Sequence, residues 1–219
     1  MKKWMTVLVA LMLALSMVTA SAAGVPSKGT GDTSSIVEIA AVSGEALPDD
    51  FVIEIVPDKI MTIDMIKDMR DFVKEGNIID YYAPEVQNDI LNHLNANKAN
   101  TEVLTLDDMK DWVANEIVTL EARNYKPSIG DVTVTFEFAT PYAEGQRVVA
   151  VLDCFNGQRV EVEPDVFEFV SEKIVLDAEV MKPVDGKGRV AVTFPGDVIV
   201  KMEDSVANGL TILSEPMAD

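Results

Sequence analysis

The residues VVAVLDCFNGQRVEVEP, Val148–Pro164, decide which residues of the predicted sandwich face its core. Apart from Asp153, every residue from Val148 to Phe155 is apolar, which is typical of a buried strand. Asn156-Gly157 is the preferred pair for a two-residue type I′ connection, so we expect a tight hairpin here. That hairpin would place one set of apolar residues on the core side: Val149, Val151, Phe155, Val160 and Val162. A one-residue bulge would reverse the assignment of the two faces.

The outer face of this hairpin carries the only cysteine of the chain. A single cysteine permits no internal disulfide, so stability has to come from packing or from bound ions or partners. The outer face is too apolar to be left in water, and we expect it to pack against the helical part of the chain or against a partner. Cys154 would then be small apolar filler and not a nucleophile, although whether it faces the core or an interface stays open. The possible interface comprises Val148, Ala150, Leu152 and Cys154.

Residues 127–216 show a period of two. DVTVTFEFAT places Val132, Val134, Phe136 and Phe138 on one face, and KIVLDAEV and GRVAVTF alternate in the same way. GLTILSE supplies a final short strand. Glycine-containing turn signals separate the segments. About six strands of this kind predict an antiparallel β-sandwich of immunoglobulin-like size.

Residues 36–126 predict a mainly helical domain, which makes the overall fold class α+β. SIVEIAAV and DDFVIEIVP are expected to be two short strands, and apolar residues at helical spacing follow in three segments. The expected helices are TIDMIKDMRDFVKEGN, APEVQNDILNHLN and TLDDMKDWVANEIVTLEA. In the third, Thr105 and Asp108 have the spacing of a capping box.

Several phrases resemble secreted proteins of anaerobic Gram-positive bacteria. They are GDVTVTFEFATPYAEGQRVVAVL, VAVTFPGDVIVKMEDS, LTILSEP and, in the helical part, YYAPEVQNDILNHL. The resemblance spans about four fifths of the chain, from Ser35 to Pro216. It implies two domains and an extracellular setting. Because that group is uncharacterised, with no assigned function, it implies no catalytic residues.

The N-terminus predicts export. Lys2 and Lys3 precede an apolar run, and Ala20-Ser21-Ala22 offers the small residues that signal peptidase requires. We expect residues 1–22 to be a signal peptide cleaved near Ala22 or Ala23, residues 23–35 to be a flexible lead-in, and the mature chain to be secreted without a transmembrane segment.

Charge excludes one class of partner. The chain has 18 basic and 37 acidic residues, a net charge of −19, and loss of the signal would remove two lysines as well. Such a field repels phosphates, so nucleic-acid binding is not expected.

Motifs for catalysis and for metals are missing from the sequence. A serine triad needs a histidine, and His93 is the only histidine of the chain. We expect His93 to be a residue near the end of a helix. A catalytic dyad of His93 with Cys154 would have to join two predicted domains. Met61, Met65 and Met69 have a spacing found in copper sites but read as core. No calcium loop or zinc motif occurs, and no cofactor is expected.

Two functions remain. We expect a non-enzymatic extracellular or cell-surface binding protein whose partner is a protein or an envelope component. The alternative is a small secreted hydrolase that uses paired carboxylates, for example on glycans. Trp112 reads as core, which leaves few exposed aromatic residues for a sugar platform, with Tyr81 and Tyr82 as candidates.

Overall fold

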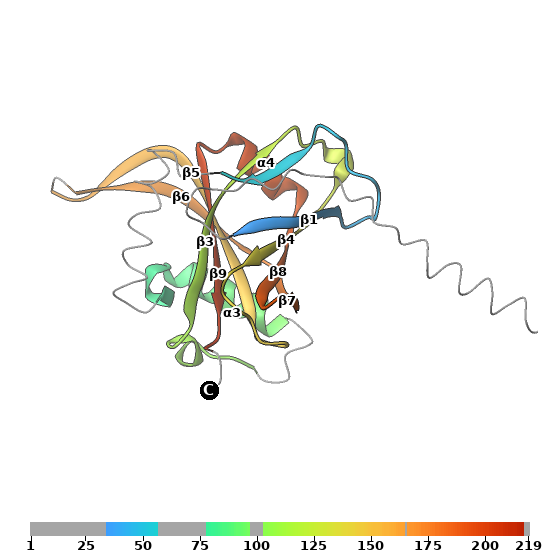
Figure 1. Ribbon diagram of the computed structural model, residues 1–219. Coiled ribbons are helices and arrows are strands. Elements are labelled where there is room, and N and C mark those ends of the chain that lie inside the picture. Colours follow the sequence, from blue (N-terminus) through green and yellow to red (C-terminus); the bar gives the residue numbers. More distant parts are fainter. Residues whose placement is uncertain (1–33, 57–77, 97–102, 165, 217–219) are drawn as a thin grey trace, which may run out of the picture.

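The computed structural model describes residues 34–56, 78–96, 103–164 and 166–216, and it is mostly β-structure (Figure 1). In chain order the elements are β1 Ser35–Ala41, β2 Val52–Ile55, the 3-10 turn η1 Ile78–Tyr81, α3 Pro84–Ala96, η2 Asp107–Met109, β3 Val113–Arg123, η3 Pro127–Ile129, β4 Val132–Phe138, β5 Val148–Glu163, β6 Val166–Leu176, β7 Ala178–Val184, β8 Lys187–Phe194, α4 Gly196–Asp204 and β9 Ala207–Ser214.

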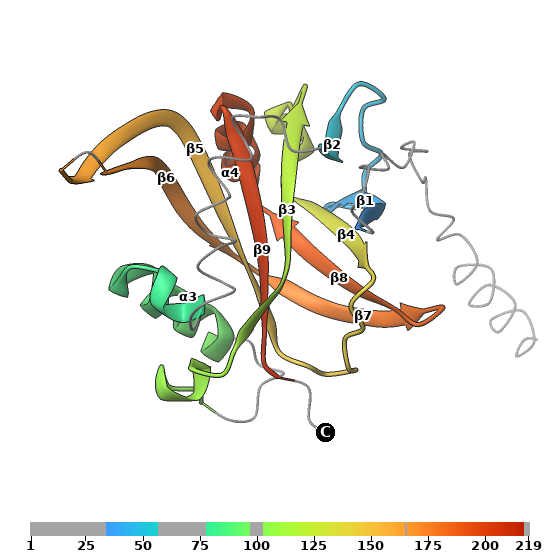
Figure 2. The same ribbon diagram turned by 60° about the vertical axis from the view of Figure 1, so that its left-hand side comes forward.

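The strands form two antiparallel sheets. The four-stranded sheet has the order β1-β4-β8-β7, and the five-stranded sheet has the order β2-β3-β9-β5-β6. β6 and β7 are one run of chain interrupted at Asp177, so this run belongs to both sheets and joins them along one side (Figure 2).

The residues that the structure describes form no helical N-terminal domain, and the α+β prediction is wrong on that point. The third expected helix is the short turn η2 followed by the long strand β3, which pairs with β2 and β9. Thr105 and Asp108 do interact as expected, since the Asp108 carboxylate accepts hydrogen bonds from both the amide and the hydroxyl of Thr105. They cap only one turn, because the consecutive β-branched residues Ile117, Val118 and Thr119 in the following segment favour a strand.

Of the other elements expected in the N-terminal part, one helix and two strands are present in the structure. α3 confirms the expected second helix, and β1 and β2 confirm the two expected strands. The first expected helix, with its methionine stripe, lies outside the described residues. β1 pairs with β4 and β2 pairs with β3, so each sheet contains strands from both sides of the boundary expected after Lys126.

The predicted hairpin at Asn156-Gly157 is also wrong, because β5 continues through this dipeptide. Phe155 pairs with Ser171 and Arg159 pairs with Phe169, so the ladder to β6 resumes after a bulge. A type I′ turn needs positive φ at both central residues. Gly157 has a φ of 79°, but Asn156 does not have a positive one. The dipeptide therefore supplies a bulge where the pairing with β9 stops, and the reversal to β6 comes later, beyond Glu163.

The bulge exchanges the two faces of β5 relative to the expectation. Even-numbered residues enter the core between the two sheets, where they meet the alternating face of β4 predicted from its sequence. Odd-numbered residues face the opposite side, where α3 and η1 pack. The even set is Val148, Ala150, Leu152 and Cys154, and the odd set packed on the helical side is Val149 and Val151.

Two helices pack against the sheets: α3 on the outer face of the five-stranded sheet and α4 against the core between the sheets. α3 contributes Ile90 and Leu94 to the cluster on the outer face of the five-stranded sheet. The side-chain amide of Gln87 in α3 donates to the carbonyls of Ile79 and Tyr82, which ties η1 to the helix. α4, where only a Pro-Gly turn was expected, packs Val198, Ile199 and Met202 onto the inter-sheet core.

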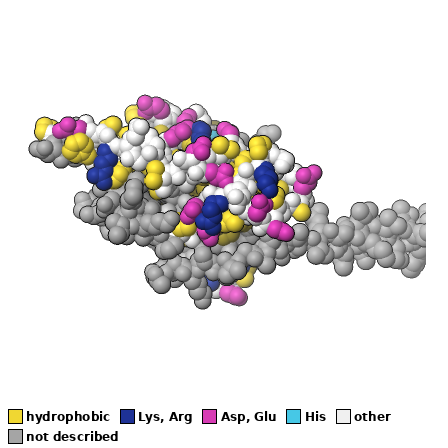
Figure 3. All heavy atoms as spheres, turned by 90° about the horizontal axis from the view of Figure 1, so that it is seen from above, with side chains coloured by type: hydrophobic (Ala, Val, Ile, Leu, Met, Phe, Trp, Pro, Cys, Tyr) yellow, Lys and Arg dark blue, Asp and Glu magenta, His cyan; other side chains and the backbone are white. Residues whose placement is uncertain are grey.

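Beyond the bulge, β5 and β6 leave the body of the molecule as a two-stranded arm (Figures 1 and 2). Val160 and Phe167 on this arm are about half exposed, at 49% and 54%. In the space-filling view, hydrophobic and acidic side chains lie together at the end of the molecule from which the arm extends (Figure 3).

Within the described ranges, no helix has the length and apolar character needed to cross a membrane.

A truncation pair on β5 tests the assignment of buried and projecting parts. Leu152 is fully buried and Val160 is half exposed on the same strand. We expect Leu152→Ala to lower the free energy of unfolding by about 3 kcal/mol, because it leaves a cavity in the inter-sheet core. Val160→Ala should change it by less than about 0.5 kcal/mol. Urea unfolding monitored by circular dichroism measures both, and equal losses would contradict the bulged register.

Candidate functional site

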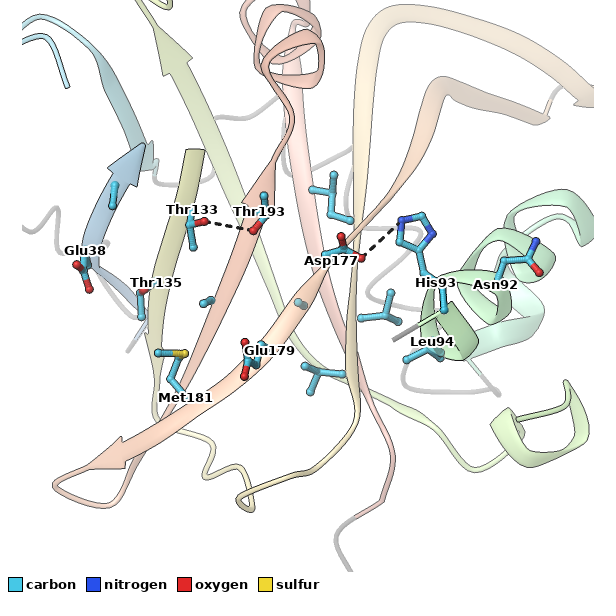
Figure 4. Close-up of a pocket in the computed structure, with 17 residues that line it drawn as sticks. Glu38, Asn92, His93, Leu94, Thr133, Thr135, Asp177, Glu179, Met181 and Thr193 are labelled. Atoms are coloured by element: carbon cyan, nitrogen blue, oxygen red, sulfur yellow. Dashed lines mark hydrogen bonds and ion pairs between the residues drawn. The ribbon is translucent and has the colours of Figure 1, made fainter. Parts of the chain in front are cut away.

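A groove of about 900 Å³ runs between the outer face of the four-stranded sheet and the C-terminal end of α3 (Figure 4). Its floor is the outward side of the strands, and its wall is the last turn of the helix. The residues that line it include Glu38, Ala40, His93, Thr133, Thr135, Asp177, Glu179, Ala191 and Thr193.

The floor is built from two cross-strand rows of small side chains. In the first row, Thr135 of β4 pairs with Glu38 of β1 on one side and with Ala191 of β8 on the other, and Ala191 pairs with Glu179 of β7. Since paired residues in antiparallel strands share a face, all four side chains point outward. The middle of this row therefore has small side chains, which leave space above the sheet, and each end of the row carries a carboxylate.

The second row brings hydroxyl groups to the floor. Ala40 pairs with Thr133, and Thr133 pairs with Thr193. The two threonine hydroxyl oxygens lie 3.2 Å apart, within hydrogen-bonding distance. The amide of Thr193 donates to the carbonyl of Asp177 at 3.0 Å, so this row ends at the break between β6 and β7.

The charge of the groove is acidic. Glu38, Asp177 and Glu179 are all exposed, and among the described lining residues His93 is the only basic-type side chain. His93 Nε2 lies 3.9 Å from the Asp177 carboxylate, and Figure 4 shows the imidazole pointing from α3 across the groove toward it. With neutral histidine the groove carries three uncompensated carboxylates at its rim.

Beside the groove, on the same face of the sheet, Glu137 forms ion pairs with two basic residues. The Glu137 carboxylate accepts hydrogen bonds from Lys187 Nζ at 2.7 Å and from Arg189 Nη2 at 2.7 Å. These donors lower the pKa of Glu137 below its usual value, Lys187 having the largest effect. The positive charges of Lys187 and Arg189 are therefore already paired with Glu137.

The carboxylates of the groove do not form the pair that glycoside cleavage requires. Glu38 and Glu179 lie three strand spacings apart, about 14 Å between their backbones. Glycosidases hold their two carboxyl groups about 5–9.5 Å apart, and the acid is kept protonated by an apolar pocket. Asp177 and Glu179 are nearer in sequence, but both are exposed. The described buried carboxylates, Asp153 and Glu137, are both ion-paired.

The structure places the four residues of the possible interface inside the molecule. Val148, Ala150, Leu152 and Cys154 belong to the core between the two sheets, and Val148 also reaches the wall of the groove. Cys154 is 5% exposed, and burial raises the pKa of its thiol to about 11. His93 lies outside the sheets on α3, so no Cys154–His93 dyad is formed.

The three aromatic residues considered for a sugar platform pack in or against a hydrophobic cluster instead. Trp112 is 3% exposed and belongs to the cluster under α3, as the sequence indicates. Tyr82 is buried in the same cluster, and Tyr81 packs against it with ring centroids 5.3 Å apart. Neither tyrosine offers a free aromatic face of the kind that sugar platforms use.

The groove was not predicted from the sequence. Its floor consists of the polar half of each alternating strand, opposite the apolar half that forms the core. The signal that was present is the recurrence of threonine at Thr133, Thr135 and Thr193, a residue type that favours flat strand faces. Which strands lie side by side, and hence which residues line the groove, is set by long-range pairing that no local pattern encodes.

Among the described residues, no three His, Cys, Asp or Glu side chains lie close enough together to hold a metal ion.

Comparison with known proteins found no match for this chain among protein-family models, curated proteins or solved structures.

Thiol labelling tests the buried position of Cys154. Because the thiol is buried and its pKa is raised to about 11, we expect modification by a maleimide at pH 7 to be slow in the native protein and rapid in urea. Mass spectrometry of timed samples gives the two rates. Equal rates with and without urea would contradict the buried site.

Titration of stability tests the Glu137 ion pair. A carboxylate with a lowered pKa in the folded state stabilises the protein above its unfolded pKa, and this contribution is lost as pH falls. We expect Glu137→Gln to lower the free energy of unfolding by about 1–2 kcal/mol at pH 7. The difference from the parent should shrink toward zero below about pH 4. A deficit that stays constant from pH 7 to pH 3, measured by urea unfolding, would show that packing and not charge accounts for it.

Proposed function

We propose that this chain is an exported, non-enzymatic binding protein and that its groove binds a basic, extended peptide segment of another protein. The observation that carries the proposal is the acidic groove with a floor of small side chains. Three exposed carboxylates stand at its rim, and threonine and alanine side chains leave space between them.

Charge complementarity supports a basic ligand. The chain has a net charge of −19, and the donors nearest the groove, Lys187 and Arg189, are occupied by Glu137. A lysine or arginine side chain that enters the groove would meet Glu38 or Glu179 at the ends of one row and the threonine hydroxyls in the middle.

An extended ligand is supported by the position of the groove on a sheet face that ends in an edge strand. β7 is the last strand of its sheet, and Glu179 on this strand lines the groove. An extended peptide can add hydrogen bonds along such an edge while its alternate side chains enter the groove.

Export and a Gram-positive source remain part of the proposal, supported by the N-terminal sequence and by the resemblance of the quoted phrases to secreted proteins. In that setting the partner would be an extracellular protein or a protein component of the envelope. A carboxylate-based hydrolase is supported less well, because the carboxylates of the groove are exposed and Glu38 and Glu179 lie far apart.

Peptide binding with groove variants tests the proposal. Fluorescence anisotropy with labelled ten-residue peptides rich in lysine and arginine should give saturable binding that weakens with salt, because exposed charges are screened within about 8 Å at physiological ionic strength. Ala191→Arg should abolish binding, since it fills the floor and adds a positive charge. Glu38→Gln with Glu179→Gln should weaken it about tenfold, at about 0.5–1 kcal/mol for each exposed contact.

Glu168→Gln is the matched control for each of the single variants Glu38→Gln and Glu179→Gln, because Glu168 is exposed on the arm, away from the groove residues. It removes one negative charge and should leave the dissociation constant nearly unchanged. Equal weakening by the control and by the groove variants would show attraction to the overall charge and would contradict a groove site. Turnover of a glycan or peptide panel that is lost in Asp177→Asn would instead support the hydrolase.

A further inference from the structure

Three polar side chains meet at hydrogen-bonding distances on the outer face of the five-stranded sheet. Lys173 Nζ lies 2.8 Å from Asp153 Oδ1 and 2.9 Å from the hydroxyl oxygen of Ser171. That hydroxyl donates to the same Asp153 oxygen at 2.9 Å. Asp153 and Lys173 are direct cross-strand partners in β5 and β6, so the backbone holds the amine against the carboxyl group.

The carboxyl group is removed from water. Asp153 is 0% exposed, and its second oxygen, Oδ2, has no hydrogen-bond partner among the described residues. The side chain of Lys173 is 20% exposed, and its Nζ lies over the ring of Tyr81, 5.3 Å from the ring centroid. Tyr82, which is fully buried, lies close enough for the charge of Asp153 to contribute to a raised pKa of its phenol. An ordinary surface ion pair has neither the burial nor the unsatisfied oxygen.

Burial favours the neutral form of the Asp153 carboxyl group over its charged form. Burial raises the pKa of Asp153, although Lys173 and Ser171 oppose the shift. Ser171 bridges the two groups as both acceptor and donor, so it can receive a proton from the ammonium and pass one to the carboxylate. Such a proton transfer would leave a neutral amine beside a neutral carboxylic acid, which is the pair that can react as nucleophile and acyl group.

We propose that Lys173 and Asp153 condense into an intramolecular isopeptide bond. The Lys173 nitrogen attacks the side-chain carbonyl carbon of Asp153, and a carbon–nitrogen bond forms. A second proton passes from that nitrogen, through Ser171, to the departing hydroxyl group, and the carbon–oxygen bond breaks. One ammonium and one carboxylate become one amide and one water molecule, so no oxidant, reductant or activated co-reactant is needed. The amide also removes two charges from a site of low polarity.

The bond would fasten the base of the projecting arm. Asp153 precedes the bulge. β9 begins at Ala207, opposite Phe155, so beyond the bulge β5 is paired with β6 but no longer with β9. A two-stranded ribbon alone is marginally stable, so a covalent link at its root would hold its two strands together. This inference does not depend on the peptide-binding groove, which lies on the other sheet.

Intact mass spectrometry of the purified full chain under denaturing conditions tests the proposal. We expect a mass lower by one water molecule than that of the sequence, and the full sequence mass for Lys173→Arg, which keeps the positive charge but cannot form this amide. Ser171→Ala should show slower or incomplete loss of water in samples taken after expression, because it lacks the proton relay.

Peptide mapping separates this bond from other dehydrations. Asp185-Gly186 can lose water by forming a cyclic imide, and that loss would persist in Lys173→Arg. With the isopeptide bond, trypsin cannot cleave after Lys173. Because Pro183 also prevents cleavage after Lys182, trypsin yields a branched product that joins residues 148–159 to residues 160–187. Recovery of the separate, unmodified peptides 148–159 and 160–173 from natively folded protein would overturn the proposal.

Discussion

Burial of β5 on both faces is the constraint on which the rest of the structure depends. From Val148 to Phe155 the strand has neighbours on both edges, β9 and β6, and packed layers on both faces. A strand in this position needs apolar residues at nearly every place and excludes an early turn. The bulge at Asn156-Gly157 follows where this support ends, and the arm begins beyond it.

Local alternation was enough to predict part of the fold. The faces of β4 and β8 follow directly from their sequences, and Val132, Val134 and Phe136 are buried as the period of two indicates. The segment after Thr105 misled because its apolar residues fit a helical spacing, while in β3 they divide between two faces: Val118 and Leu120 enter the inter-sheet core and Ile117 packs near Phe155 on the other side. A strand that is buried on both sides leaves no alternation to detect.

The groove and the polar cluster of Lys173 depend on contacts between distant parts of the chain. Glu38 and Glu179 become ends of one row only because β1, β4, β8 and β7 align in that register. Asp153 looked like one polar exception in an apolar stretch, and its significance appears only with Lys173 opposite. The acidic sequence thus provides two distinct settings for carboxylates: exposed at the rim of the groove and enclosed at the root of the arm.

Hydrogen exchange along β5 tests this account most directly. Peptides covering Val148–Phe155 should be among the last to exchange, because their amides lie in a strand paired on both edges and buried on both faces. Peptides covering the arm, from Gln158 to Phe169, should exchange much earlier. Comparable exchange in the two segments, measured by mass spectrometry under native conditions, would contradict a central strand that continues into a projecting arm.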